Sequence, residues 1–155
     1  MALKCAEALT LVVTQTMNAI FPVHARLKEK HKKYWREASF EVSGIVGVTG
    51  PIRGGLALSF PMKLARRLTA SMLQEADPES CCEKDVCDCV GEVANIVAGN
   101  LLPHLSDDNS CNEKLSMSLP SVVVGTHEVV WNSKDMPCES LLFDSELGMF
   151  AAEMS

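Results

Sequence analysis

The sequence predicts an α+β domain in which helices pack on one face of a largely antiparallel sheet. Three segments repeat apolar residues at helical spacing, and several others show strand-like patterns broken by glycine, proline and serine. Their order is a helix, a glycine-rich hairpin, two helices and then several strands, which is typical of this two-layer class. The length of 155 residues favours a single domain over residues 1–155.

The first element is an amphipathic helix over Ala2–Phe21, which ends before Pro22. The segment Arg26–Arg36 follows and holds six of the 14 basic residues. We interpret it as a solvated connector or helix end, because charge runs usually form solvated surface. Attraction of an acidic partner is the alternative.

A change of period at Ser39 marks the hairpin. A strand runs from there to the turn at Gly50-Pro51, and Ile52–Phe60 returns as its partner. Gly54-Gly55 is not a phosphate-binding loop, because no Lys-Ser or Lys-Thr follows it. Close packing or a strand bulge explains this glycine pair better.

Two helices come next, over Pro61–Glu75 and Glu83–His104, with a loop at 77–80 between them. Valines three or four residues apart give the second helix a continuous buried stripe. A polar loop at Ser106–Ser110 separates this helix from the last strands. These strand-like segments are Lys114–Leu119, Ser121–Val130 and Leu141–Met154, the last with a break at 145–146.

Composition narrows the classes of function. The net charge of −6 disfavours nucleic-acid binding, which needs a surplus of Lys and Arg to neutralise phosphates. Polar residues interrupt the N-terminal apolar run, so neither a signal peptide nor a membrane span is predicted. Seven cysteines, an odd number, indicate free thiols in a reducing, cytoplasmic compartment.

A polar stripe runs along the long helix opposite its valines. Its members are spaced 3, 4, 3 and 4 residues apart, and they are Asp85, Asp88, Glu92, Asn95 and Gly99. Asparagine is a weak helix former, and a mid-helix glycine costs about 1 kcal/mol relative to alanine. An amide can both donate and accept hydrogen bonds, and a glycine lets another backbone come close. The stripe is therefore a candidate working site, with a solvated polar face as the alternative.

The residues of this helix carry a resemblance. Residues 88–100, DCVGEVANIVAGN, resemble the signature helix of the CheC/CheX/FliY phosphatases of bacterial chemotaxis, in which an E-x-x-N motif is followed by Gly-Asn. The hairpin at 44–60, the helix after it and the segment 115–125 also stand in the order of a CheX domain. The resemblance covers about 39–125. Only one E-x-x-N is present, and CheC-type members carry two, so the resemblance favours CheX.

The resemblance implies a phosphatase that hydrolyses the aspartyl phosphate of a CheY-like response-regulator receiver. Asn95 would hold the attacking water, and Glu92 would contact the receiver's active-site lysine. Asp88 and Gly99 would join these two catalytic residues in the partner-binding face. The receiver supplies its own divalent ion, Mg²⁺, so no cofactor or metal bound by this chain is expected. The family fold is a two-layer α+β domain, and its members imply a homodimer joined through the sheets.

Two other functions stay open. A non-catalytic scaffold or flagellar-switch adaptor would keep the docking helix without the chemistry. A thiol or metal sensor would use the cysteine cluster at positions 81, 82, 87 and 89, although its spacing is not that of a zinc site and the histidines are scattered. The segment Leu141–Met154 is compatible with a sheet edge that a second copy covers.

Overall fold

The computed structural model describes residues 2–33, 38–51, 53–105, 114–125 and 138–155. Its helices are α1 (Ala2–Ile20), α2 (Met62–Leu73) and α3 (Glu83–Leu105), with a short 3-10 turn η1 (Pro78–Ser80) before α3. Its strands are β1 (Arg26–Lys33), β2 (Val42–Thr49), β3 (Gly54–Phe60), β4 (Ser116–Met117), β5 (Ser121–Val124), β6 (Cys138–Asp144) and β7 (Phe150–Met154). The predicted helices and the hairpin are confirmed, with ends that differ by a few residues.

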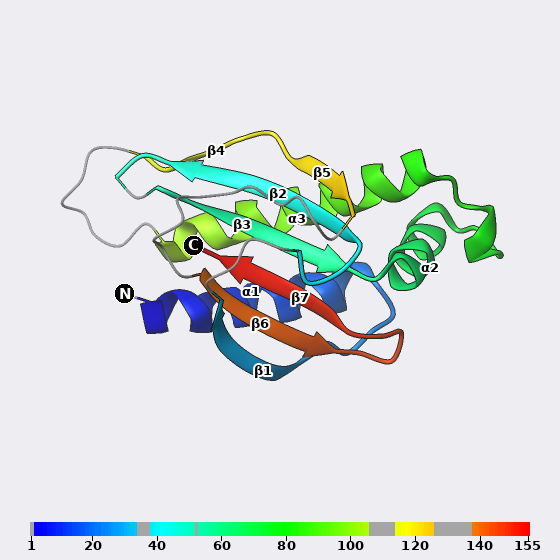
Figure 1. The fold of residues 1–155 in the computed structure, drawn as a ribbon, viewed down its shortest axis with the longest axis horizontal. Helices are drawn as coiled ribbons and strands as arrows, with labels where there is room; N and C mark the ends of the chain where they lie inside the picture. The colour runs from blue at the N-terminus through cyan, green and yellow to red at the C-terminus, as the bar shows by residue number, and fades with distance from the viewer. Residues whose placement is uncertain (1, 34–37, 52, 106–113, 126–137) are drawn as a thin grey trace.

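The strands form one sheet in the order β1-β6-β7-β3-β2-β4, and β5 also pairs with β2. Every pairing is antiparallel. Helices α1 and α3 lie side by side on one face of this sheet, behind it in Figure 1, and α2 packs against α3 at one end. The predicted α+β class, with helices on one face of an antiparallel sheet, is therefore confirmed.

The core lies between the sheet and the helices. Leu9, Val13 and Met17 of α1 face it, as does the predicted valine stripe of α3. On the sheet side, Phe60, Phe143 and Phe150 stack at centroid distances of 5.1 to 5.4 Å. No helix in the described part of the chain has the length and apolar character needed to cross a bilayer.

The interpretation of Arg26–Arg36 as a connector or helix end is wrong for its described part. Residues 26–33 form strand β1, which pairs antiparallel with β6. The pattern misleads because the residues from Arg26 to Lys32 are all exposed, so no apolar alternation marks a buried face. Hydrogen bonds to β6, more than a hundred residues later, determine this strand, and residues 34–36 lie outside the description.

The C-terminal segment is not a sheet edge. Strand β6 lies between β1 and β7, and β7 lies between β6 and β3. Leu141, Phe143 and Phe150 are hydrophobic because they face the core, and β1 already covers the outer side of β6. The predicted loop at 106–110 and the last part of the predicted strand at 121–130 fall outside the described residues.

Candidate functional site

Helix α3 is held against the sheet at one close contact. Gly44 of β2 lies directly under the helix, and a Cβ atom there would be 2.9 Å from the Ala94 Cβ and 3.0 Å from the Val90 carbonyl oxygen. A real Cβ essentially never comes that close to a neighbour, so α3 sits at this height because residue 44 is glycine. This contact fixes the position of the outward face of α3 relative to the sheet.

The predicted stripe lies on that outward face. Asp88, Glu92 and Gly99 are exposed, and Asn95 is half-buried. Val90, Val93 and Val97 are buried on the other side of the helix. Residues three apart on a helix have Cβ atoms about 5–6 Å apart, so Glu92 and Asn95 are surface neighbours. The fold therefore brings the four predicted site residues together on one accessible surface.

The polar side chains of this surface differ in whether they have a hydrogen-bond or ion-pair partner within the chain. Asp88 accepts a hydrogen bond from the Lys84 ammonium, one helical turn earlier, with 3.1 Å between Nζ and Oδ2. Within the described residues, neither Glu92 nor Asn95 makes a side-chain hydrogen bond or ion pair. The carboxylate and the amide are thus available to a molecule outside the chain, whereas Asp88 is partly neutralised.

Gly99 gives the same surface an uncovered patch of backbone. A Cβ at Gly99 would meet nothing within 4 Å, so no described part of this chain requires a glycine there by close approach. Pro103 stands four residues later inside α3 and has no N–H, so the Gly99 carbonyl lacks the usual i+4 amide donor. The helix backbone at Gly99 is therefore not covered by a side chain of its own on this surface.

Two walls flank the stripe, and the residue pattern indicated neither. On one side α3 packs on the segment around β5, where a Cβ at Gly91 would be 3.3 Å from a methyl of Val122. On the other side α1 packs on α3, and the Asn100 amide donates to the Thr16 hydroxyl at 3.3 Å. A hollow of about 430 Å³ between these helices is lined by Val12, Gln15, Thr16, Ala19, Asn100 and His104. No local signal links α1 to α3, because more than 80 residues separate their contacting side chains.

The described residues show no metal-binding centre at the cysteine cluster, and two of its four thiols are buried. Cys81 and Cys89 are each 5% exposed, and burial raises the pKa of both thiols. The carboxylates of Asp85 and Glu75 raise the pKa of Cys81 further. Across the residues that the structure describes, no group of three or more His, Cys, Asp or Glu side chains could hold a metal ion. Cys81 and Cys89 therefore have the character of protonated structural thiols.

Alkylation with iodoacetamide at pH 8 tests this assignment. Cys82 is exposed, and we expect it to react before Cys81 and Cys89, because a raised pKa lowers the thiolate fraction and burial blocks the reagent. Mass spectrometry of peptides from the folded protein gives the order of modification. In urea the three rates should converge. Faster modification of Cys89 than of Cys82 in the folded state would contradict the assignment.

Comparison with known proteins identifies the family of this chain. Residues 42–144 match the family model described as chemotaxis phosphatase CheX, which is about two thirds of the chain and includes β2, β3, α2 and the whole stripe on α3. The chain belongs to the CheX family. No curated protein sequence matches this CheX-family chain.

Solved structures of the family share the fold. A chemotaxis protein CheX from Desulfovibrio desulfuricans is 22% identical, with a TM-score of 0.82 over 97% of each chain. A CheC-like superfamily protein from Shewanella sp. PV-4 is 26% identical, with a TM-score of 0.80 over 99% of this chain and 97% of that one. The CheX of a CheX–CheY–BeF3–Mg²⁺ complex from Borrelia burgdorferi is 16% identical, with a TM-score of 0.74 over 97% and 96%. The described architecture is therefore that of CheX and CheC-like proteins.

Proposed function

We propose that this chain accelerates hydrolysis of the aspartyl phosphate of a CheY-like receiver, in chemotaxis or a related two-component pathway. The observation that carries the proposal is the pair of unengaged side chains, Glu92 and Asn95, side by side on the outward face of α3. A CheX from Borrelia burgdorferi forms a complex with CheY. This complex supports a CheY-like receiver as the proposed partner of this chain.

Hydrolysis of an aspartyl phosphate requires few groups from this chain. Water attacks the phosphorus, the bond between phosphorus and the aspartyl oxygen breaks, and the products are inorganic phosphate and a free carboxylate. The receiver supplies Mg²⁺ and a lysine to balance the charge of the phosphoryl group, so this chain needs no cofactor of its own. What remains is to hold the water in line with the breaking bond, and positioning of a nucleophile can contribute up to about 7–11 kcal/mol.

Asn95 suits this task because its amide oxygen can accept a hydrogen bond from the water without removing a proton. Glu92, one helical turn away on the same surface, would accept a charge-assisted hydrogen bond from the receiver lysine and fix the register of docking. Asp88 and the open backbone at Gly99 would complete the contact surface.

A single-turnover assay of phosphate release tests the proposal. The host's receiver domains are phosphorylated in turn, and the loss of phosphate is followed with and without the chain. Acceleration for at least one receiver supports the proposal. Binding without acceleration would select the alternative, a receiver-binding scaffold or flagellar-switch adaptor. Absence of both binding and acceleration for all receivers would refute both functions.

Replacing Glu92 with alanine should weaken productive docking. We expect about a fivefold to tenfold loss of acceleration at subsaturating receiver and a smaller loss at saturation, because a lost charge-assisted hydrogen bond acts mainly on binding. The matched control is Glu79→Ala, which removes an exposed carboxylate of the same charge from η1, away from the stripe. Equal losses in the two variants would indicate a general charge effect and not a contact of Glu92.

We also propose that the chain forms a homodimer, as the family resemblance implies. We propose a cytoplasmic location because the odd number of cysteines indicates free thiols. Sedimentation velocity over a range of concentrations tests the first. A single species with the mass of one chain at all concentrations would exclude the dimer.

A further inference from the structure

The basic strand β1 and the groove beside it have no part in the proposed phosphatase. On its outer side β1 pairs with no described strand, so alternate N–H and C=O groups of this edge lack a strand partner. Five of its eight residues are basic and one is acidic, a net of +4 in a chain whose total is −6. This concentration of positive charge on one edge strand calls for its own explanation.

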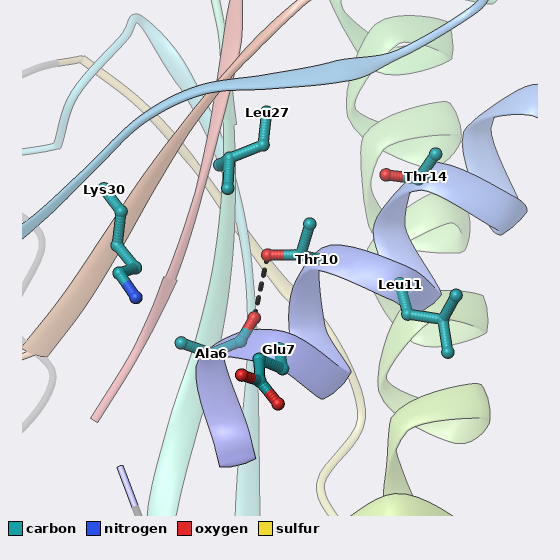
Figure 2. A pocket seen from close by; sticks show the side chains of 7 residues that line it. All are labelled: Ala6, Glu7, Thr10, Leu11, Thr14, Leu27 and Lys30. Carbon is teal, nitrogen blue, oxygen red and sulfur yellow. Dashed lines mark hydrogen bonds between the residues drawn. The ribbon is translucent and has the colours of Figure 1, made fainter. Parts of the chain in front are cut away.

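A groove of about 370 Å³ separates β1 from α1. Leu27 and Lys30 point into it from β1, opposite α1, as Figure 2 shows. Leu11 on the helix side is 46% exposed and Leu27 is 41% exposed, so the groove leaves apolar surface in water. It is lined by Ala6, Glu7, Thr10, Leu11, Thr14, Leu27 and Lys30, and Glu7 is the one acidic residue among them.

Register with β6 shows which side chains of β1 face the same way. Leu27, Lys30 and Lys32 pair with Phe143, Leu141 and Glu139, which alternate along β6 on the helix-facing side of the sheet. A bulge at Lys28 brings Leu27 into line with the two lysines, and the Lys28 ammonium turns to the Met149 sulfur at 3.6 Å. Neither Lys30 nor Lys32 has an ion-pair partner in the described residues.

We propose that the edge of β1 and this groove bind an extended acidic segment of another protein as an added strand. The main chain of the segment would pair with β1, an apolar side chain would enter the groove beside Leu27, and carboxylates on the same face would lie opposite Lys30 and Lys32. Unpartnered lysines on an edge protect it against indiscriminate pairing, and they also select strands of opposite charge.

Charge argues against the other occupants. A second copy of β1 alongside the first would set +4 against +4, and like charges opposite each other destabilise a strand pair. Nucleic acid binds through its phosphates and would not fill the groove lined by Leu11 and Leu27. The net charge of −6 also disfavours nucleic-acid binding. An acidic, partly apolar peptide is the chemistry that fits both the charge and the groove.

A fluorescein-labelled nine-residue peptide is a suitable probe, with two valines at one end and glutamates at alternate positions toward the other, threonines between them. We expect saturable binding by fluorescence anisotropy that weakens as salt rises. The same peptide with lysine in place of glutamate should not bind. Hydrogen exchange should slow at the outward amides of β1 when the glutamate peptide is bound.

Variants separate the proposed contact from bulk charge. Lys30→Glu should weaken binding about fivefold, and Lys63→Glu on α2, with the same change of charge, should leave it unchanged. Leu11→Ser tests the apolar half of the groove at an exposed helix position that the fold tolerates. Asn95→Ala should bind the peptide normally, and Lys30→Glu should keep its phosphatase activity, so this proposal and the phosphatase proposal fail independently.

Several results would overturn the proposal. One is no saturable binding of the glutamate peptide, and another is equal weakening by Lys30→Glu and Lys63→Glu. Tighter binding of a single-stranded DNA oligomer at the same edge would assign the strand to nucleic acid. A homodimer lost on Lys30→Glu would assign it to a second copy of the chain.

Discussion

Replacing Asn95 with alanine should reduce the acceleration of phosphate release by at least about a hundredfold and leave the protein folded. The side chain is half-buried on the outer face of α3 and makes no hydrogen bond to a described residue, so its loss removes no hydrogen bond that holds the helix. Alanine also favours the helix more than asparagine does. The expected loss is large because the attacking water is no longer held in line with the phosphorus, and this positioning provides most of the proposed acceleration. Single-turnover release at saturating receiver is the measurement.

Asn100→Ala is the matched control for this variant. It removes the same amide from the same helix, but the Asn100 side chain donates to Thr16 of α1 and does not lie on the stripe. We expect it to lower the free energy of unfolding by about 1 kcal/mol and to retain acceleration. Full acceleration in Asn95→Ala, or its loss in Asn100→Ala at normal stability, would refute the role given to Asn95.

Replacing Gly44 with alanine should have the largest effect on stability. The new methyl would meet the Ala94 Cβ and the Val90 carbonyl, neither of which is the end of a flexible side chain. Helix α3 must therefore move away from β2, at a cost of about 1–3 kcal/mol in the free energy of unfolding. The shift also displaces the site, so acceleration should fall in the fraction that stays folded. Urea denaturation and phosphate release measure the two effects.

Gly47→Ala is the control on the same strand. A Cβ at Gly47 would lie 3.5 Å from the Ser118 hydroxyl, an ordinary contact distance. We expect a change within about 0.5 kcal/mol and normal activity. If Gly44→Ala were as stable as Gly47→Ala, the close approach of α3 to β2 would not fix the position of the site.

The candidate site could be predicted from sequence because it lies on one helix. The spacing of Asp88, Glu92, Asn95 and Gly99 determines that they share a face once residues 83–105 are helical. The valines on the opposite side determine that this face points away from the core. The catalytic roles stay predictions, since they depend on a partner protein.

What sequence could not supply depends on pairing between distant residues. Strand β1 has the charge pattern of solvated surface, and only its pairing with β6, over a hundred residues later, makes it a strand. That pairing also moves the C-terminal strands from the predicted edge into the middle of the sheet. The contact of Asn100 with Thr16 was invisible for the same reason. Local periodicity predicts the helices and the hairpin, whereas long-range pairing determines strand β1 and which strands lie at the edges of the sheet.

Helix α1 contributes to both hollows: Leu11 lines the groove beside β1, and Thr16 lines the hollow beside α3. One helix thus lines the groove of the proposed peptide site and packs on α3, which carries the proposed receiver-binding stripe. If an occupant of the groove shifts α1 and changes the affinity for a receiver by some factor, thermodynamic linkage requires the receiver to change the affinity for that occupant by the same factor. The coupling between the two surfaces can therefore be measured from either side, with the short peptide as the simpler titrant.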